Sequence, residues 1–397
     1  MDFQLTEDHL TTRKWAHDFA EREIRPVAPE YDETEEFPWP VVKKAAEMGL
    51  YSLEFWTEMV TPDQTGLILP LVMEEASWGC AGISLGIFGT GLPLAALAYS
   101  ATPEQLVEWG PKMLGTPEDP KLGAFAVTET EAGSDVSALR TTARRDGDEW
   151  VLNGRKVFIT NGGIADVHVV VATVDPDLGH RGQAAFIVGP GTPGLSQGKK
   201  ERKLGIRASH TAEVVLEDCR VPLENVSGGM ERLEAKLERA RSRNGTGQHH
   251  ALKTFEMTRP SVAAQALGIA RAALEYSIDY AKQRETFGKP IIDHQGIAFK
   301  LADMALEVDA ARLLTWRAAW MAKNGVEFGH AEGSMSKLKA SEVAVWVTEQ
   351  AVQILGGYGY IKDFPVEKWY RDAKIYTLFE GTSEIQRLVI SRALATE

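Results

Sequence analysis

The sequence predicts an α+β protein with an N-terminal helical domain, a central small β-barrel or sandwich domain and a C-terminal helical bundle. Two observations support this class. The spacing of apolar residues changes from helical to alternating near residue 121 and returns to helical after residue 222. Prolines and glycines between residues 111 and 120 mark the first change. A length of 397 residues corresponds to roughly two or three domains, which we place at 1–120, 121–226 and 227–397.

The first domain is expected to be helical from its start. Thr6 precedes two acidic residues, the pattern of a capped helix whose first turn favours negative charge. We expect this helix to end at Pro26 and another to cover 39–49. Residues 76–103 carry no charge and are long enough to cross a bilayer, but glycines and Pro93 interrupt them. We therefore expect two buried helical pieces around a bend.

The second domain has the signals of short strands. Asp146-Gly147 and Asn153-Gly154 are dipeptides favoured in tight hairpin turns. Strands are expected over 150–152, 157–160, 167–174, 184–188 and 213–216, and the basic run 199–203 is expected to be an exposed loop.

The third domain consists of long segments with helical spacing. These cover 260–283, with Pro260 at the start, then 294–323 and 331–355, where Gly356 and Gly357 end the last one. The charge-dense segment 230–257, broken at 244–247, is expected to be a solvated helix and loop.

Charge and motifs argue against several classes of function. The chain has 56 acidic and 43 basic residues, a formal charge of −13, which argues against nucleic acid or an anionic membrane as the main partner. Two cysteines, Cys80 and Cys219, are too few for a disulfide framework or a cysteine-based zinc site. The start lacks the pattern of a secretory signal, so we expect a cytoplasmic protein. No metal-ligand motif, P-loop or dinucleotide-binding glycine fingerprint is present in the sequence.

One serine lies in a motif of hydrolases. Gly82 to Gly86 match the G-x-S-x-G pattern around Ser84. That motif functions only where a strand turns sharply into a helix, and here a helical segment precedes it. We interpret the match as chance, with a serine thioesterase using Ser84 as an alternative function.

Four other segments could carry chemistry. In 126–135, hydroxyls and Gly133 suit a phosphate, because glycine lets a backbone amide approach closely. In 157–163, Phe158 and Thr160 lie on one side of a strand, which suits a planar heterocycle. In 284–288, Arg284 could bind a pyrophosphate through charge-assisted hydrogen bonds. In 353–360, a glycine cluster ends a helix. Taken singly, each segment has a purely structural explanation, such as a turn or a core aromatic residue.

Together, in this order and on this α-β-α plan, the four segments resemble one family, the acyl-CoA dehydrogenases. The resemblance covers nearly the whole chain, and its two signatures match 126–138 and 353–372. It implies bound FAD without a Rossmann fold, which agrees with the missing glycine fingerprint. It also implies a homotetramer built as a dimer of dimers, and an electron-transferring flavoprotein as the electron acceptor.

The resemblance assigns roles to individual residues. It implies that one subunit holds FAD with Phe125, Val127, Thr128, Gly133, Ser134, Phe158, Ile159, Thr160, Thr382 and Glu384. It implies that a neighbouring subunit reaches the same FAD with Arg284, Thr286, Phe287, Gln295, Gln353, Gly356 and Gly357. Substrate binding is implied for Ser134, Glu256, Thr258, Arg259 and Gly381.

The implied reaction is α,β-dehydrogenation of a fatty-acyl-CoA to a trans-2-enoyl-CoA, with Glu380 as the α-proton base and hydride transfer to the flavin. The residues themselves support this base. Ser383 and Gln386 predict a capping box that places Glu380 near a helix N-terminus, and apolar surroundings would raise its pKa. The family's other base position holds Thr258, whose hydroxyl is too weakly basic.

Three departures from the family pattern bear on contact with the electron partner. Thr130 replaces a usual proline, Glu131 a common glycine and Phe158 a frequent tryptophan. Alternatives within the fold are a flavoenzyme for a branched or steroid side-chain thioester and a nitroalkane oxidase, which would have aspartate in place of Glu380. A CoA-binding protein without catalysis is a further alternative, which the complete flavin and base motifs oppose. The sequence leaves the acyl chain length open.

Overall fold

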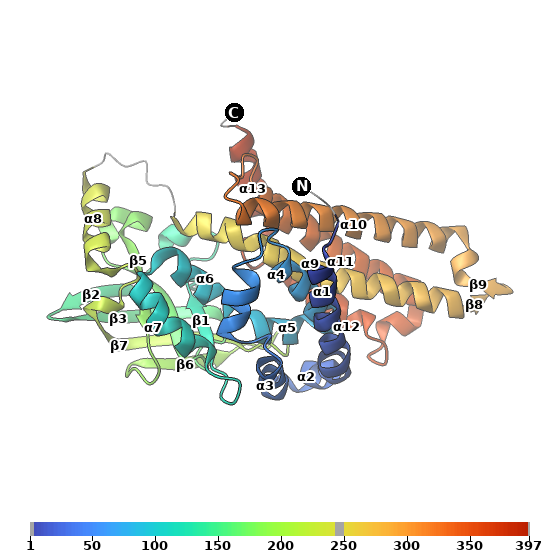
Figure 1. The fold of residues 1–397 in the computed structure, drawn as a ribbon, viewed down its shortest axis with the longest axis horizontal. Coiled ribbons are helices and arrows are strands. Elements are labelled where there is room, and N and C mark those ends of the chain that lie inside the picture. Colours follow the sequence, from blue (N-terminus) through green and yellow to red (C-terminus); the bar gives the residue numbers. More distant parts are fainter. Residues whose placement is uncertain (1–3, 243–249, 396–397) are drawn as a thin grey trace.

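The computed structural model describes residues 4–242 and 250–395, and its elements follow the predicted order of helices, sheet and helices (Figure 1). Thr6 caps the first helix as predicted, and its Oγ1 accepts a hydrogen bond from the His9 amide at 3.3 Å. The helical path does not stop at Pro26: it widens into a π-helical turn over Ala20–Ile24 and then tightens into a 3-10 turn over Arg25–Val27 before α2. The N-terminal α-helices are α1 (Glu7–Phe19), α2 (Ala28–Thr34), α3 (Trp39–Glu47), α4 (Ile68–Gly79), α5 (Ala81–Phe88), α6 (Gly91–Ser100) and α7 (Pro103–Leu114).

The uncharged stretch forms two helical pieces, as predicted, because α5 ends before Gly89 and α6 begins at Gly91. By length and composition Ala81–Ser100 could cross a membrane, but 67% of its most apolar stretch is buried inside the fold. Ser84 is fully buried within α5 and accepts a hydrogen bond from the Ser77 hydroxyl at 2.9 Å. A buried serine in the middle of a helix cannot serve as an exposed nucleophile, so the thioesterase alternative is wrong.

The central domain is a curled seven-stranded sheet in the order β1-β4-β2-β3-β7-β6, with β5 paired to β4. Its strands are β1 (Gly123–Ala126), β2 (Thr142–Asp146), β3 (Glu149–Thr160), β4 (Val167–Thr173), β5 (Gln183–Val188), β6 (Leu195–Lys200) and β7 (Thr211–Pro222). The Asp146-Gly147 hairpin is confirmed, since it joins β2 to β3. The first two residues of the basic run belong to β6, so only its remainder is a loop.

The predicted hairpin at Asn153-Gly154 is wrong. Both residues lie inside β3, at a register shift against β7, so the two predicted strands over 150–160 are one strand. Asn153 donates a side-chain hydrogen bond to Asp218 at 3.1 Å and accepts one from the Asp218 amide at 2.8 Å. The backbone freedom of glycine suits a bulge as well as a turn, and the partner strand decides between them.

The C-terminal part is a helical bundle. Its helices are α8 (Gly229–Arg241), α9 (His250–Gln283), α10 (Gln295–Lys323), α11 (Glu332–Leu355), α12 (Val366–Ala373) and α13 (Ser383–Leu394). Pro260 lies inside α9 and does not start it, which corrects the prediction. The predicted break at 244–247 lies outside the described residues. A hairpin of β8 (Glu285–Thr286) and β9 (Lys289–Pro290) connects α9 to α10.

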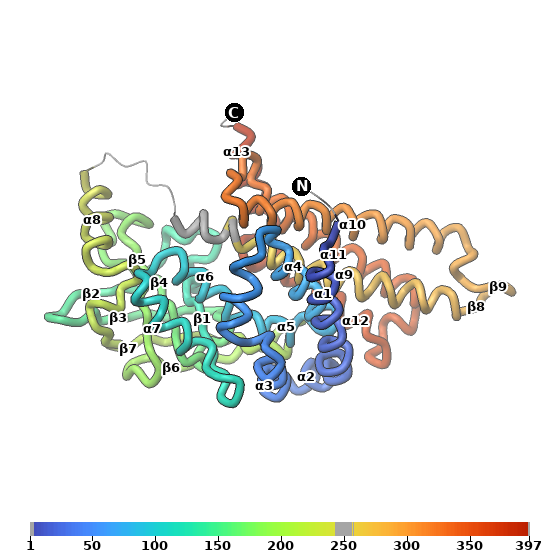
Figure 2. The backbone as a smooth tube through the Cα atoms, viewed as in Figure 1, coloured from blue at the N-terminus to red at the C-terminus, as the bar shows by residue number. Residues whose placement is uncertain are grey.

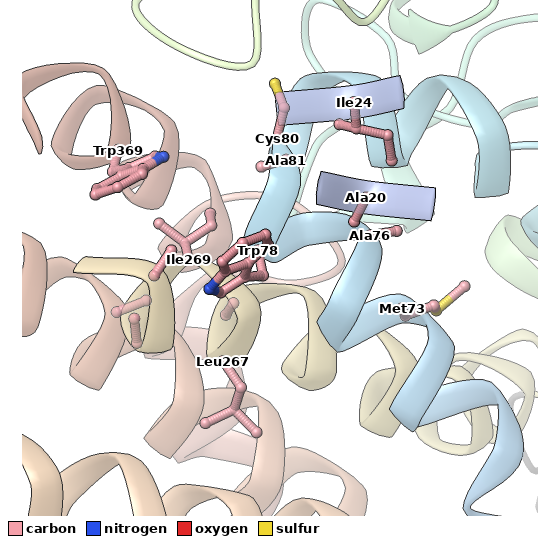
Figure 3. Packing of buried hydrophobic residues seen from close by; sticks show 14 of the residues in the cluster. Ala20, Ile24, Met73, Ala76, Trp78, Cys80, Ala81, Leu267, Ile269 and Trp369 are labelled. Carbon is pink, nitrogen blue, oxygen red and sulfur yellow. The ribbon is translucent and has the colours of Figure 1, made fainter. Parts of the chain in front are cut away.

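The main apolar core joins the N-terminal helices to this bundle. Figure 3 shows Trp78 of α4 beside Ile269 of α9, and Leu267 of α9 and Trp369 of α12 belong to the same cluster. The contact between α4 and α9 is very close, because a Cβ atom added at Gly268 would lie 2.2 Å from the carbonyl oxygen of Glu74. Any side chain at position 268 would therefore force the two helices apart.

A buried ion-pair network adds polar contacts to the same helices. Arg271 of α9 contacts Glu74 of α4 at 3.0 Å and also pairs with Glu75, while Arg312 of α10 reaches Glu74 at 2.9 Å. Moving one of these helices would separate the ion pairs and leave a buried charge uncompensated. The network therefore fixes the relative positions of α4, α9 and α10.

The sheet and the hairpin lie at opposite ends of the molecule. Figure 2 shows the strands at one end, while α9 and α10 run away from them to the other end, where β8 and β9 project. The α13 helix stands out from the bundle and carries the C-terminus, on the same side as the N-terminus (Figures 1 and 2).

Candidate active site

Glu380 lies in the short loop between the 3-10 turn Lys374–Thr377 and α13. Glu380 and Gly381 both have left-handed backbone angles, with φ of 54° and 87°. A left-handed glutamate is unfavourable unless its surroundings hold it, so such a turn is a sign of a constrained site. The loop then enters α13 through Thr382, whose hydroxyl accepts a hydrogen bond from the Ile385 amide at 3.3 Å.

The predicted capping box is therefore wrong by one residue. Thr382 caps α13, and Ser383 is the first residue of the helix. Gln386 does not return to its own helix end but donates hydrogen bonds to the carbonyls of Glu380 at 3.1 Å and Gly381 at 2.9 Å. Lys337 of α11 donates a further hydrogen bond to the Gly381 carbonyl at 2.6 Å. Two elements thus hold the turn from different sides.

The surroundings of the Glu380 carboxyl group favour its protonated form. The residue is half-buried, and its Oε2 is shielded from solvent without a hydrogen-bond partner in the described part of the chain. Burial raises the pKa of Glu380, and the positive charges of Arg259 and Lys337 oppose that rise. A carboxylate with one unpartnered oxygen and a raised pKa has the properties of a general base.

A second charged group near Glu380 is Arg259 of α9. Arg259 is buried, pairs with Glu256 and donates a hydrogen bond to the Ser334 hydroxyl at 2.5 Å. The Glu256 carboxylate also accepts the Ser334 amide at 2.8 Å, so hydrogen bonds already engage it. Burial lowers the pKa of Arg259 to about 10. Thr258 is half-buried. The substrate-binding roles of these α9 residues stay predictions.

The strand end at Phe158 presents an aromatic ring on an open face. Phe158 has φ of 60° and is 65% exposed, at a register shift in β3. The neighbouring Ile159 is buried and Thr160 is half-buried. The irregular backbone at this shift turns the ring outward, where a planar ligand can cover it.

The loop after β1 lies next to the same strand, because the Val157 amide donates a hydrogen bond to the Thr128 carbonyl at 2.9 Å. Gly133 and Ser134 in this loop are exposed, and a Cβ atom added at Gly133 would meet nothing within 4 Å. The predicted phosphate-binding loop and the predicted ring-binding strand are therefore neighbours in space.

A second group of predicted residues lies at the hairpin end of the bundle. Arg284 stacks over the ring of Tyr358 at 5.9 Å, which brings the β8–β9 hairpin next to the glycine cluster after α11. Phe287 at the hairpin tip is 97% exposed. The other members of this group are exposed apart from one half-buried threonine: Thr286, Gln295, Gln353, Gly356 and Gly357. Figure 1 shows this group far from the sheet, so one chain does not bring the two predicted sets together.

Three family models match the chain in succession. The acyl-CoA dehydrogenase N-terminal domain matches residues 6–116, the middle domain 124–219 and the C-terminal domain 245–395. The chain belongs to the acyl-CoA dehydrogenase family. The resemblance read from the sequence is confirmed, and with it an oxidoreductase that dehydrogenates acyl-CoA.

Individual acyl-CoA dehydrogenases are similar over their full length. The mitochondrial short-chain specific acyl-CoA dehydrogenase of Rattus norvegicus is 43% identical over 390 residues, which is 98% of this chain and 90% of that protein. Butyryl-CoA dehydrogenase from Megasphaera elsdenii is 39% identical, with a TM-score of 0.89 and coverage of 100% of both chains. A chain in a structure described as electron transferring flavoprotein of Acidaminococcus fermentans gives the same TM-score, 0.89, 39% identity and 100% coverage of both chains.

The residues of this acyl-CoA dehydrogenase fit a flavin. The exposed ring of Phe158 can lie against a planar heterocycle, and the open backbone at Gly133 leaves room for a phosphate. The described residues contain no group of three or more histidine, cysteine, aspartate or glutamate side chains that could hold a metal ion. Cys80 and Cys219 are both buried free thiols.

Sequence reasoning missed the buried cations that support the site. Lys156 of β3 is fully buried and donates hydrogen bonds to Glu129 at 2.8 Å and to the Val127 carbonyl at 2.9 Å. Lys337 is also fully buried. One signal could have found it, since Lys337 shares a helical stripe with Ala340 and Ala344, where an apolar residue is expected.

Proposed function

We propose that this protein oxidises the α,β carbon bond of a short fatty-acyl-CoA and gives the trans-2-enoyl-CoA, with Glu380 as the base. The observation that carries this proposal is the Glu380 carboxyl group, which is shielded, unpartnered at Oε2 and held in a constrained turn. Its raised pKa suits a group that must take a weakly acidic α-proton near neutral pH. The names of the relatives, short-chain specific and butyryl-CoA dehydrogenase, support a short acyl chain.

The residues of the chain divide the work in this proposal. Phe158 and Thr160 orient the flavin ring, and the loop with Thr128, Gly133 and Ser134 binds its pyrophosphate. When bound, FAD supplies the acceptor for the β-hydrogen, which leaves with its electron pair. The Glu380 carboxylate removes the α-proton and becomes a carboxylic acid, and the two carbons then share the new double bond.

Backbone donors complete the reaction centre. Negative charge develops on the thioester oxygen as the α-proton leaves, and hydrogen-bond donors placed there lower the barrier. The backbone next to Glu380 lies at the N-terminal end of α13, where amides and the helix dipole favour negative charge.

Electron removal and assembly belong to the same proposal. A matched structure described as an electron transferring flavoprotein supports such a protein as the electron acceptor. The exposed Arg284, Phe287 and Gln353 lie far from the sheet of their own chain, which supports their serving the flavin of a neighbouring subunit in a tetramer.

Glu380→Gln tests the proposal, because glutamine keeps the shape and removes the basic oxygen. We expect flavin reduction by butyryl-CoA to slow at least about a hundredfold, the usual effect of removing a general base, while FAD content and acyl-CoA affinity stay near wild type. Stopped-flow absorbance of the flavin measures this. Glu256→Gln is the matched control, since Glu256 is the other carboxylate near Arg259. Normal flavin bleaching in Glu380→Gln together with loss in Glu256→Gln would move the base to Glu256.

A further inference from the structure

Lys337 is a buried lysine in the second turn of α11, and the proposed chemistry gives it no role. Its side chain is fully buried, and its ammonium donates a hydrogen bond to the Gly381 carbonyl at 2.6 Å. Burying an ammonium group away from water is unfavourable unless its contacts compensate for the lost hydration. Lysine at this position therefore needs a reason beyond packing, since an apolar residue would fill the same space more favourably.

The hydrogen bond of Lys337 acts directly on the turn that carries the base. Glu380 and Gly381 are consecutive residues with positive φ, so small backbone rotations there would redirect the Glu380 side chain. Gln386 also holds the Gly381 carbonyl, at 2.9 Å, but with a neutral amide. Of these two donors to the Gly381 carbonyl, Lys337 is the charged one, and it links the turn to α11.

Lys337 also adds positive charge near the Glu380 carboxyl group. Two cations act on the Glu380 carboxyl group, Arg259 from α9 and Lys337 from α11. Glu384 from α13 is a negative group that acts on Lys337 itself. Arg259 is paired with Glu256, which offsets part of its charge, whereas the hydrogen bond of Lys337 goes to an uncharged carbonyl. Desolvation lowers the pKa of Lys337 to about 8, and the negative charge of Glu380 opposes that shift.

We propose that Lys337 is a positioning residue for the base: it fixes the Gly381 carbonyl and supplies the positive field that keeps Glu380 ionised when an apolar acyl chain covers it. This inference rests on the proposed function, because it requires Glu380 to act as the base. A group that acts in this way changes the rate and pH dependence of proton removal and leaves cofactor binding unchanged.

Lys337→Met tests this in the flavin-loaded enzyme, with two readouts: flavin reduction across pH 5 to 9 and exchange of the substrate α-proton in deuterated water. We expect both rates to fall about 10- to 100-fold at neutral pH, from misplacement of the base. We also expect the acid limb of the rate profile to move about one pH unit higher, because a nearby positive charge has been removed. The KM and the FAD content should stay near wild type.

Two further variants separate charge from general damage to the helix. Lys337→Arg keeps the charge and should restore the acid limb while the rate recovers only in part. Lys339→Met is the matched control, since Lys339 lies two residues along the same helix, is partly exposed and pairs with Glu307. Its rate and pH profile should equal those of wild type.

A folded, flavin-loaded Lys337→Met with the wild-type rate and acid limb would overturn the inference. If Lys337→Met does not fold, the neutral Lys337→Gln takes its place, and an unshifted limb in that variant overturns it equally. The combination with Glu380→Gln adds a second criterion, because a residue that acts through Glu380 costs no further rate once Glu380 is lost. An additive loss would contradict the inference, whereas wild-type speed in Glu380→Gln alone would contradict the proposed function.

Discussion

Lys156 of β3 and Glu129, which lies between Thr128 and Gly133 in the loop after β1, form a buried ion pair, 2.8 Å long. The Glu129 carboxylate also accepts the amides of Arg140 at 2.6 Å and Thr141 at 3.0 Å. The pair therefore ties the loop after β1 to β3 and to the segment before β2. The loop that we propose for pyrophosphate binding is thus held in place through its own Glu129 side chain.

Lys156→Met should destabilise the protein, because it leaves the Glu129 carboxylate buried without its cation. We expect a loss of about 3–5 kcal/mol in the free energy of unfolding, the usual cost of breaking a buried ion pair. Urea unfolding measures this, and FAD affinity should fall with it. The double variant Glu129→Gln/Lys156→Met is the control and should recover part of the loss. Equal stability of Lys156→Met and wild type would show that the pair is not structurally required.

The rate of flavin reduction should depend on pH through Glu380. Burial raises the pKa of Glu380, and only the ionised form can accept the α-proton. Activity is therefore complete well above this pKa and falls as the pH decreases through it, at higher pH than for an ordinary glutamate. The logarithm of kcat/KM for butyryl-CoA against pH measures the limb. A rate that stays constant down to the usual glutamate range of about pH 4.3 would contradict this assignment.

His168 should make the fold sensitive to acid. Its Nε2 accepts a hydrogen bond from the Gly163 amide at 3.1 Å, so the ring must be neutral, and burial lowers the pKa of His168 to about 4. The pKa of histidine in an unfolded chain is about 6.5. The neutral, buried His168 therefore contributes its full stabilisation above that pH, and this stabilisation is lost as the pH falls toward 4. The loss at pH 4 is about 3 kcal/mol.

The variant His168→Gln keeps a side-chain acceptor and removes the titration. Urea unfolding at pH 7 and at pH 4.5 should show a smaller drop in the free energy of unfolding for His168→Gln than for wild type. The same drop in both proteins would assign the acid sensitivity to other groups.

Arg284→Ala should lose FAD without unfolding the sheet. Arg284 is exposed and stacks on Tyr358, far from the strands, so its removal leaves the β domain untouched. The flavin absorbance of the purified variant and its circular dichroism measure the two effects. Lys282→Ala removes a neighbouring exposed charge and should keep its flavin. A wild-type protein that is a flavin-loaded monomer by light scattering would disprove the shared site.

The parts of the fold that the sequence predicted well are those set by local signals. The α10 and α11 helices begin and end within a residue of the predicted positions. At the end of α11 the local signal is Gly356, whose φ of 62° suits glycine. Asn153-Gly154 could not be placed in this way. The same dipeptide serves a turn or a bulge, and only the contact with Asp218 on β7, 65 residues away, makes it a bulge.

The candidate site shows the same division. The Glu380 loop can be proposed from the sequence because its motif is contiguous. The cap residue is Thr382 and not the predicted Ser383, and Gln386 binds the turn at the Gly381 carbonyl. The helical stripe that Lys337 shares with Ala340 and Ala344 indicates a buried position, but its contact with the base loop depends on how α11 packs. Such residues are found from tertiary contacts, since their role is to hold another residue.

The distance between the β8–β9 hairpin and the exposed ring of Phe158 has a thermodynamic consequence if two chains complete each flavin site. Cofactor binding and subunit association are then reciprocal: any factor by which assembly tightens the hold on FAD is the factor by which FAD tightens assembly. Dilution would dissociate the subunits and release FAD together, and added FAD would restore both the assembly and the bound flavin. The concentration of the protein would then set its cofactor occupancy, and a change at the hairpin would weaken flavin binding at the far end of a different chain.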